Sequence, residues 1–491
     1  MVVHVAAAQT IVEQKIHAAD GQPGEWFGSA VALEESTAVV GARQDDANGP
    51  GSGSAYVFIK DASGWVEQQK LIASDGSDDE RFGRSVSLSG DYALIGAYRD
   101  NLDAGSAYVF MRSGVTWAQQ AKLVASDGAS GDYFGLAVGL SGDYAVVGAW
   151  GDNVAGDSSG SAYIFVRTGT VWIQQAKLEA SDGFADDRFG RSVAISGDYA
   201  VVGAYGDDDG GGAAGSVYVF ERTGPFWNET AKLTASDGMG GAHFGLAVAI
   251  SGDYILVGAH TAGTDSSGAA YVFKRDTTGW SETAKLTASD AGTGTEFGIS
   301  VGITPGFAMI GSWLDTVNGD SSGSAYIFAE TGTTWSEYVK IVPSDGRSRD
   351  QFGRDVAIST TDAIAGALLA DGATSNAGAA YVYKDVLLDV EPTARPAIPE
   401  AFDLSQNYPN PFNPATIIRF VLHKTAEVEL TVHDILGKKV RTLLHRDQSA
   451  GEHAVTWDGT NDKGESVAGA MYVYRLRTGS SIQTRKMMLL K

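Results

Sequence analysis

The sequence contains no cysteine, only 11 prolines and eight histidines among 491 residues, and no long hydrophobic run. Without cysteine the chain forms neither disulfides nor thiolate metal sites, so a packed core must stabilise it. No apolar stretch approaches the ~18 residues that a membrane-spanning helix needs. Basic residues are also scarce, with 36 Lys and Arg against 60 Asp and Glu, a net charge of −24. This excess of negative charge argues against nucleic acid as a partner, because phosphate binding needs a basic surface.

The N-terminus lacks the pattern of a signal peptide. Residues 1–9 include a short apolar stretch but no basic start. A secretory signal needs both a positively charged start and a longer apolar segment. We therefore expect that the export signal is missing from this N-terminus.

Charge is distributed unevenly along the chain. Residues 401–491 hold 12 basic and 9 acidic residues, which leaves 24 basic and 51 acidic residues in residues 1–400. A change in charge balance of this size indicates two parts that are built differently. We therefore expect an acidic N-terminal part and a separate, weakly basic C-terminal domain.

Phe-Gly pairs recur along the N-terminal part at intervals of 52 to 55 residues. Each interval contains four short runs rich in Val, Ile, Tyr and Phe, separated by turn residues, which is typical of strands. A period near 50 residues with four strands per unit predicts the blades of a β-propeller. The seven pairs begin at Phe27, Phe82, Phe134, Phe189, Phe244, Phe297 and Phe352.

The two ends of the repeat array complement each other. The last repeat lacks a fourth strand, whereas residues 10–16 match residues 335–341 of the sixth repeat in length and register. A strand from the N-terminus that completes the last blade closes the ring and leaves no large sheet edge open. The sequence therefore predicts a seven-bladed propeller over residues 9–386.

The repeats resemble the FG-GAP repeat family, whose best-known members form seven-bladed propellers in integrin α-chains. The resemblance depends on the Phe-Gly pairs, on Val-Val-Gly-Ala stretches such as Val201 to Ala204, and on strands such as Gly53 to Phe58. Integrin-type blades often carry a Ca²⁺ loop between their first two strands. Here that connection is a short Ser-Gly-Asp-Tyr hairpin, as at Ser196, so the Ca²⁺ site of the family is not carried over.

The C-terminal part begins after a proline-rich segment. Six of the 11 prolines lie between Pro392 and Pro414, and residues 387–401 are typical of a stiff, extended linker. Short alternating strands follow over residues 402–491, which predicts a small immunoglobulin-like β-sandwich. The fold class is therefore all-β, a seven-bladed β-propeller followed by this sandwich.

Residues 402–491 closely resemble the C-terminal sorting domain of the bacterial type IX secretion system. The matching segments are Asn407 to Pro414, Asp434 to Gly437, Trp457 to Gly459, Tyr472 to Leu476 and Thr484 to Met487. The resemblance implies periplasmic passage in a Gram-negative bacterium and recognition by the type IX machinery at the outer membrane. It also implies release from the cell or attachment to its surface.

Acidic residues concentrate on one face of the predicted propeller. The loops that join blades and the loops of variable length after Gly-Ala open on the same face and hold 29 of the 51 acidic residues of residues 1–400. Three histidines, His17, His243 and His260, fall near this face without the spacing of metal ligands. Six arginines accompany the acids there, namely Arg43, Arg81, Arg99, Arg188, Arg347 and Arg349.

The variable loops predict a cation-binding face, with Ca²⁺ as the candidate cation. Hard cations take carboxylate and carbonyl oxygens from flexible loops. The alternative interpretation is structural, because Asp stabilises tight turns and acidic side chains aid solubility. The candidate metal ligands are Asp152, Asp157, Asp207, Asp208, Asp209, Asp315 and Asp320.

These observations favour a secreted or cell-surface binding module over an enzyme. The loop face is expected to bind a glycan, a matrix component or a surface protein. One alternative is a structural surface component without a discrete ligand. A second alternative is a secreted polysaccharide hydrolase that uses a pair of rim carboxylates, since glycoside cleavage requires only two suitably spaced acids.

Overall fold

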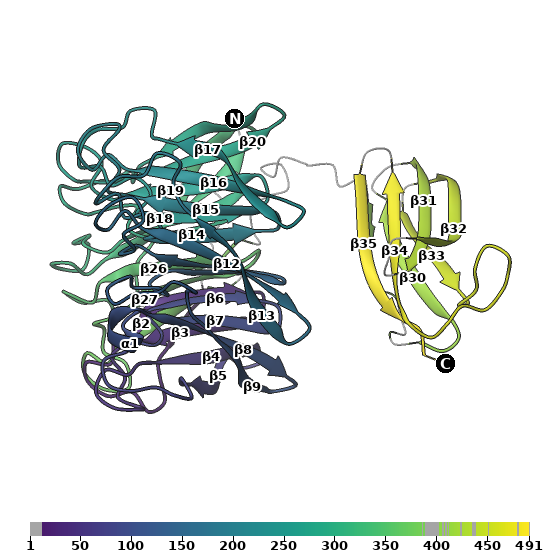
Figure 1. Ribbon diagram of the computed structural model, residues 1–491, viewed down its shortest axis with the longest axis horizontal. Coiled ribbons are helices and arrows are strands. Elements are labelled where there is room, and N and C mark those ends of the chain that lie inside the picture. Colours follow the sequence, from purple (N-terminus) through teal and green to yellow (C-terminus); the bar gives the residue numbers. More distant parts are fainter. Residues whose placement is uncertain are drawn as a thin grey trace, which may run out of the picture. The chain divides into compact units, whose positions relative to one another are not determined.

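The computed structural model describes residues 12–384 and 386–387 of the N-terminal unit. In the C-terminal unit it describes residues 402–404, 407, 410, 412–422, 425–434, 438–449, 451–478 and 481–490. The chain divides into two compact units, Met1–Arg395 and Pro396–Lys491 (Figure 1). The expected signal region and all but residue 387 of the expected linker lie outside the described residues. Among the described residues, no helix is long and apolar enough to cross a membrane.

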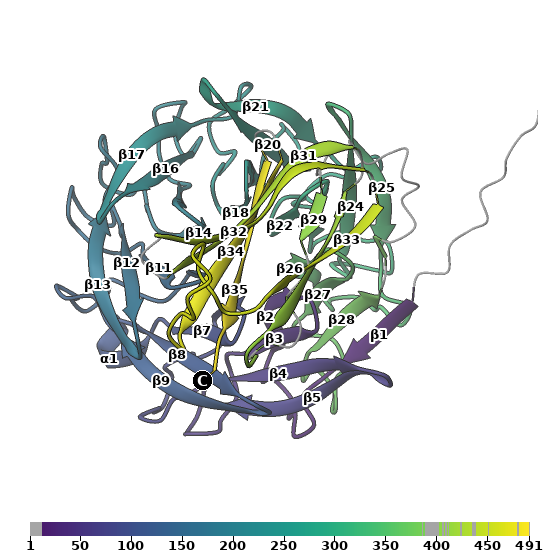
Figure 2. The same ribbon diagram turned by 90° about the vertical axis from the view of Figure 1, so that its right-hand side faces the viewer.

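In the described part of the first unit, seven four-stranded antiparallel sheets are arranged around a central axis (Figure 2). We number the blades by their inner strands, which line the axis and contact one another around it. The inner strands are β2 (Phe27–Glu34), β6 (Ser85–Ser89), β10 (Val138–Ser141), β14 (Ser192–Ser196), β18 (Ala247–Ser251), β22 (Val301–Thr304) and β26 (Phe352–Ile358). The second strands are β3 (Thr37–Ala42), β7 (Tyr92–Ala97), β11 (Tyr144–Ala149), β15 (Tyr199–Ala204), β19 (Tyr254–Ala259), β23 (Phe307–Ser312) and β27 (Ala363–Ala367).

The two outer positions of each blade follow the same order. The third strands are β4 (Ser54–Asp61), β8 (Ser106–Ser113), β12 (Ser161–Thr168), β16 (Ser216–Thr223), β20 (Ala269–Asp276), β24 (Ser324–Thr331) and β28 (Ala379–Lys384). The outer strands are β5 (Gly64–Leu71), β9 (Thr116–Leu123), β13 (Val171–Leu178), β17 (Phe226–Leu233), β21 (Gly279–Leu286), β25 (Thr334–Ile341) and β1 (Val12–Ile16). A short helical turn, α1 (Asp100–Asp103), lies in the variable loop of blade two.

Blade seven combines the two ends of the propeller. Its sheet has the order β1-β28-β27-β26, and β1 pairs antiparallel with β28 from Val12, opposite Lys384, to Ile16, opposite Ala380. Ile16 is buried in the hydrophobic cluster that joins blade seven to blade one. The N-terminal strand therefore contributes both backbone pairing and core packing at the point where the ring closes.

The core lies between the blades. Each of seven hydrophobic clusters draws its side chains from two neighbouring blades. Phe82 shows the repeated contact, because its fully buried ring packs edge-on against Tyr108 at 5.5 Å and Phe110 at 6.0 Å between ring centroids. Every residue of β3 is buried, as expected for a strand covered on both faces by other sheets.

The glycine of each Phe-Gly pair allows close approach of two backbones. Gly83 has a φ of 85°, and a Cβ atom at this position would lie 2.2 Å from the carbonyl oxygen of Ser54. Only glycine adopts this conformation without strain and leaves the needed space. The Phe-Gly pairs are therefore structural elements of the blade.

The C-terminal unit is a β-sandwich. One sheet has the order β29 (Phe402–Leu404), β30 (Thr416–Leu422), β33 (Gly451–Trp457). The other has the order β32 (Lys439–Gln448), β31 (Ala426–Asp434), β34 (Met471–Thr478), β35 (Ser481–Met488). Trp457 is fully buried between the sheets and packs against Phe412 at 5.5 Å and Tyr472 at 5.1 Å. The predicted fold class, an all-β chain with a seven-bladed propeller and a sandwich, is confirmed.

Candidate functional site

The acids of the loop face form a repeated arrangement that we call the Asp–Tyr–Lys network. In blade one, the hydroxyl of Tyr56 lies 2.8 Å from the Asp20 carboxylate and 2.7 Å from that of Asp45. The ammonium of Lys70 lies 2.8 and 2.7 Å from the same two carboxylates. Five blades contain the full set, namely Asp20, Asp45, Tyr56 and Lys70; Asp75, Asp100, Tyr108 and Lys122; Asp127, Asp152, Tyr163 and Lys177; Asp182, Asp207, Tyr218 and Lys232; and Asp290, Asp315, Tyr326 and Lys340.

Two blades lack the second aspartate. Ala262 replaces it in blade five and Ala370 in blade seven. In blade five, Lys285 and Tyr271 therefore share only Asp237, at 2.6 and 2.8 Å. A cavity of about 90 Å³ lies beside Ala262, where the missing carboxylate would sit.

The network accounts for three of the predicted metal ligands. Asp152, Asp207 and Asp315 each contact the network lysine, at 2.7 to 2.9 Å. Burial by itself raises the pKa of Asp315, but hydrogen bonds from Lys340 and Ser324 outweigh it and the pKa lies below its usual value. These three aspartates were predicted as Ca²⁺ ligands, and in the structure a lysine supplies the positive charge beside them.

The other four candidates are not drawn into one group. Asp209 contacts Lys232 at 2.6 Å, while the side chains of Asp157, Asp208 and Asp320 are exposed to solvent. Within the described ranges, no group of three or more His, Asp or Glu side chains is placed to hold a metal ion. Ca²⁺ binding by the variable loops stays a prediction.

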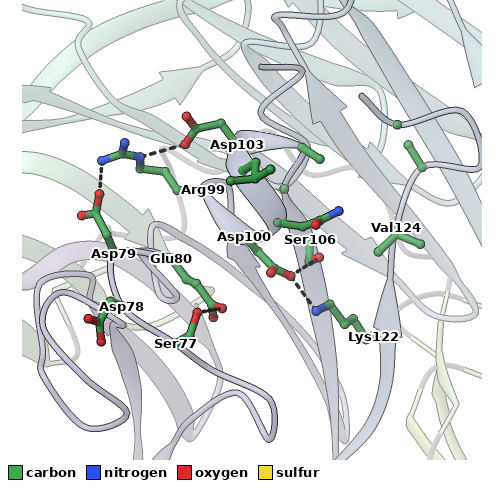
Figure 3. A pocket seen from close by; sticks show the side chains of 16 residues that line it. Ser77, Asp78, Asp79, Glu80, Arg99, Asp100, Asp103, Ser106, Lys122 and Val124 are labelled. Carbon is green, nitrogen blue, oxygen red and sulfur yellow. Dashed lines mark hydrogen bonds and ion pairs between the residues drawn. The ribbon is translucent and has the colours of Figure 1, made fainter. Parts of the chain in front are cut away.

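A cavity of about 740 Å³ lies on the loop face beside α1 (Figure 3). Arg99 pairs with Asp79 and, at 2.9 Å, with Asp103, while Asp100 contacts Lys122 at 2.6 Å. The hydroxyl of Ser77 donates a hydrogen bond of 2.7 Å to Glu80. The charged groups of this cavity largely satisfy one another, which leaves few of them for a ligand.

A different set of charges lines the central channel. The inner strands enclose a cavity of about 260 Å³ at the end where they begin, and it is lined by four arginines and one acid. Three of the arginines directly follow Phe-Gly pairs, and the fourth follows β3. The next cavity along the axis, of about 270 Å³, is lined mainly by apolar residues and glycines of the same strands. The charged lining residues are Arg43, Arg84, Arg191, Arg354 and Asp355.

The channel arginines have no acidic partner within 4 Å in the part of the chain that the structure describes. Burial, together with the charges of the other arginines, lowers the pKa of Arg191 to about 9 and that of Arg354 to about 10. Asp355 accepts a hydrogen bond of 2.8 Å from the backbone N–H of Val31, and burial raises its pKa to about 6. The channel therefore holds an excess of positive charge inside a strongly acidic chain.

The residue before each Phe-Gly pair forms a first ring around this end of the channel. All seven are non-glycine residues with φ between 53° and 62°, in the left-handed region, and all are partly buried. This conformation is costly for side chains other than glycine, and such strain concentrates at functional positions. The ring consists of Trp26, Arg81, Tyr133, Arg188, His243, Glu296 and Gln351.

The residue that follows each second strand forms a second ring, rich in aromatic side chains. Tyr133 of the first ring stacks on Trp150 of the second, with ring centroids 5.1 Å apart and planes 8° apart. The guanidinium of Arg354 lies 4.1 Å from the centroid of Trp313. The second ring consists of Arg43, Tyr98, Trp150, Tyr205, His260, Trp313 and Leu368.

We call the two rings together with the channel arginines and Asp355 the channel mouth. Five of its polar atoms are buried without a hydrogen-bond partner among the described residues, namely Arg43 Nε, Arg81 Nη1, Arg188 Nε, Trp150 Nε1 and His260 Nδ1. Burial lowers the pKa of His260 to about 4, so this imidazole is neutral at neutral pH. Aromatic faces, unpaired guanidiniums and unsatisfied polar atoms on one concave surface are the groups that recognise ligands.

The channel mouth was not predicted as a site from the sequence, although Arg43, Arg81, Arg188, His243 and His260 were placed near the loop face. The available signal was the pattern of variation between repeats. Positions that pack the blades stay apolar or keep one residue, whereas the two ring positions keep their spacing and change between charged, polar, aromatic and apolar residues. The spacing of these positions is therefore fixed by the fold, whereas their residue type is not fixed by packing.

Comparisons with known proteins agree with this architecture. The FG-GAP repeat model matches residues 11–58, 65–110, 117–165, 172–220, 227–273, 280–328 and 335–383, and a FlgD Ig-like domain model matches residues 413–479. A search of the curated proteins found no match.

Two solved structures show distant likeness. PorZ of Porphyromonas gingivalis, described as an essential bacterial surface component of the type IX secretion system, is 12% identical. That alignment covers 94% of this chain and 65% of the PorZ chain, with a TM-score of 0.34. A putative 6-phosphogluconolactonase from Bacteroides uniformis is 13% identical over 65% of this chain and 86% of its own, with a TM-score of 0.43. Neither likeness bears on the function of this chain, whereas the seven matched repeats span most of its length, and the chain belongs to the FG-GAP repeat family.

Proposed function

We propose that this chain is a secreted or cell-surface binding protein that holds its ligand at the channel mouth. The single observation that supports this proposal is the contrast within each repeat. The packing positions keep the same or a similar apolar residue, while the ring positions present tryptophan, tyrosine, histidine, arginine and glutamate on one strained surface. Binding residues on loops held by a rigid scaffold are a common way to build a recognition surface. The ligand classes remain a glycan, a matrix component or a surface protein.

The same geometry favours binding over catalysis. A rim hydrolase needs two carboxylates that are free to act as acid and base. In five blades the two closest rim carboxylates share one lysine and one tyrosine hydroxyl instead, as Asp182 and Asp207 do with Lys232 and Tyr218. An ion-paired carboxylate whose pKa lies below its usual value, such as Asp182, is a poor general acid.

For the C-terminal unit, we propose a role in export through the type IX secretion machinery of a Gram-negative bacterium. The support is the set of sequence segments that resemble the sorting domains of that system. Several of these segments form the core of the sandwich, since Trp457 is fully buried and Tyr474 is hydrogen-bonded to the backbone N–H of Asn407 at 2.8 Å.

The binding proposal is tested by applying the purified full chain to an array of glycans and matrix proteins. The test variant is Tyr133→Ala/Trp150→Ala, which removes one stacked pair of the channel mouth. The matched control is Phe226→Ala, which removes an aromatic ring that is 69% exposed on the outer strand β17. We expect saturable binding that the control retains and the test variant loses. Equal binding by both variants would place the ligand elsewhere, and no binding at all would favour the structural role.

Running the same array in Ca²⁺ and in EDTA tests the cation prediction for the variable loops. Binding that disappears in EDTA supports a Ca²⁺ requirement. Binding that is the same in both buffers contradicts it and leaves the channel mouth as the binding surface.

The export proposal is tested by removing residues 402–491 in the producing cell. We expect the propeller to fold and accumulate in the periplasm, measured by fractionation and by protease resistance. Normal delivery of the shortened chain to the cell surface would contradict the proposal.

A further inference from the structure

The geometry points to an oxyanion site inside the channel mouth, in which Arg84, Arg191 and Arg354 hold a carboxylate, sulfate or phosphate group. This inference rests on the proposed function, since it names the chemical class of the ligand for the same surface. It places the anionic group of the ligand in the cavity at the start of the inner strands, with the remainder of the ligand against the aromatic rings.

The first argument is that these arginines are unpaired. Four of the six arginines that the sequence places on the loop face have acidic partners, namely Arg81, Arg99, Arg347 and Arg349. Among the described residues, neither Arg84 nor Arg191 contacts a carboxylate, although the chain has 60 acidic side chains to offer. All three arginines are partly buried. A partly buried guanidinium without a counter-ion costs free energy, and an oxyanion that enters the cavity recovers it.

The second argument comes from the repeat. The position that follows Phe-Gly points into the channel in every blade, and in three blades it is leucine or isoleucine. An aliphatic side chain therefore satisfies the packing at this position, so packing alone does not call for arginine. The seven residues at this position are Ser29, Arg84, Leu136, Arg191, Leu246, Ile299 and Arg354.

The third argument concerns shape and chemistry. A cavity of about 260 Å³ admits a small oxyanion together with several waters, each of which occupies about 30 Å³ in the liquid. Guanidinium groups match carboxylate, sulfate and phosphate oxygens with two parallel N–H donors. The Trp313 ring stacks against Arg354 and restricts its orientation, which prepares the group for binding.

The single acid of the cavity modulates this charge. Asp355 projects among the arginines from β26, and its backbone contact with Val31 holds it in place. The charged groups that face it are Arg84 and Arg354, and both favour its ionised form. Because Asp355 opposes the entry of a second negative charge, its replacement by asparagine is expected to tighten oxyanion binding severalfold at pH 7.

The test is a calorimetric titration of the full chain with sodium sulfate, sodium phosphate and sodium acetate, at constant ionic strength. The test variant, Arg84→Leu/Arg191→Leu, installs the residue that blades three and five carry at this position. The control, Arg222→Leu, removes a positive charge that is paired with Asp198 at the opposite end of blade four. We expect one saturable site for at least one of these anions, with affinity at least tenfold lower in the test variant and within twofold of wild type in the control.

A melting curve of each variant separates loss of binding from loss of folding. The double variant removes two partly buried, unpaired charges, so we expect its melting temperature to equal or exceed that of wild type without added anion. If the double variant does not fold, Arg191→Gln is used, which removes the charge but keeps hydrogen-bonding capacity, and an affinity loss of at least threefold is expected.

Dextran sulfate and uncharged dextran distinguish a free anion from the same group on a polysaccharide. Tighter binding of dextran sulfate than of inorganic sulfate, lost in the double variant, supports a site that reads an anionic group on a larger ligand. Equal affinity of wild type and the double variant for every anion, or no saturable binding of any of them, overturns the inference. Array binding that the double variant retains would also overturn it while leaving the proposed function intact.

Discussion

The Asp–Tyr–Lys networks and the channel mouth lie on the same face of the propeller. The lysines of the networks are ion-paired, whereas the arginines of the channel are not. In blade four, Lys232 contacts three carboxylates at 2.6, 2.7 and 2.9 Å. In the channel mouth, Arg84 and Arg191 contact none among the described residues. The networks recur in most blades, whereas the residues of the mouth vary around the ring, with only blades two and four carrying the same set.

This contrast separates structural charges from charges kept for a ligand. A lysine that bridges the joining loop and the variable loop ties two loops to the outer strand of a blade. The channel arginines, which are partly buried without counter-ions, contribute no such tie and reduce stability. The first-ring residues have a similar effect. Their left-handed backbone conformation lowers stability at positions where the residue type varies between blades.

The largest expected change in stability comes from removing a lysine of an Asp–Tyr–Lys network. Lys232→Met leaves Asp182, Asp207 and Asp209 without their shared cation, and Asp207 is buried, with a side chain only 5% exposed. We expect a loss of about 2–4 kcal/mol in the free energy of unfolding, measured in urea, because a buried carboxylate loses its only ion pair. Two of the three carboxylates are partly exposed to solvent, which keeps the value below that for a fully buried triad.

Lys285→Met in blade five is the matched control for that substitution. Lys285 has only Asp237 as a partner, and both side chains are at least one-third exposed. The expected loss is about 0–1 kcal/mol. Equal losses at Lys232 and Lys285 would show that the second aspartate adds nothing, and the structural interpretation of the networks would fail.

The next effect lies in the channel mouth and has the opposite sign. Burial raises the pKa of Asp355 to about 6 from 3.8, so ionisation of this group is disfavoured in the folded state. The stability of the wild-type chain is therefore highest, with respect to this group, below pH 4 and falls as the pH rises through 6. Asp355→Asn keeps an oxygen for the Val31 N–H, and we expect it to raise the free energy of unfolding at pH 7 by about 1–2 kcal/mol.

The pH dependence identifies the cause of that gain. At pH 4 the difference between wild type and Asp355→Asn should vanish, because the aspartate is then protonated in the folded state. Urea denaturation at pH 4, 5.5 and 7 measures this. A gain that is independent of pH would show that ionisation of Asp355 is not its cause, and a loss at pH 7 would show that Asp355 is a stabilising partner of the arginines.

A smaller gain is expected where a network is incomplete. Ala262→Asp in blade five fills the cavity of about 90 Å³ beside Lys285 and Tyr271 and supplies the missing carboxylate. We expect a gain of about 1 kcal/mol at neutral pH, the size of one partly buried charged hydrogen bond. Ala262→Asn is the uncharged control, and thermal melts that rank it equal to or above Ala262→Asp would contradict the assignment.

The smallest effect tests strain in the first ring. Gln351 has a φ of 56°, a conformation that glycine adopts freely. Gln351→Gly should raise the free energy of unfolding by about 0.5–1 kcal/mol, measured by urea denaturation, after the greater entropy loss of glycine is included. A destabilised variant would mean that contacts of the glutamine side chain stabilise the loop by more than the backbone strain at this residue destabilises it.

The repeat made the fold predictable from the sequence. Phe82, Gly83 and Gly96 recur at fixed offsets in every blade, and fixed offsets are what packing between blades imposes. The networks were within reach as well, because Lys70 recurs in each outer strand with the same period as Asp20 and opposite charges with one period are natural partners.

Variation between repeats marks the ring positions in the sequence, but the sequence does not show that their side chains meet at one channel. Arg84 and Arg191 lie 107 residues apart in the sequence, and only the closed ring brings them to one shared cavity. The left-handed conformation of residues such as Tyr133 also has no sequence signal, since no glycine marks it. Long-range closure and backbone conformation at single residues decide which side chains meet.

The most direct test of the account is a crystal structure of the full chain grown in sodium selenate, with anomalous data collected at the selenium edge. The account predicts an anomalous peak inside the channel, between the guanidinium groups of Arg84, Arg191 and Arg354, that is absent in Arg84→Leu/Arg191→Leu. A channel without anomalous density in wild-type crystals, at a selenate concentration that saturates any site seen by calorimetry, would contradict it.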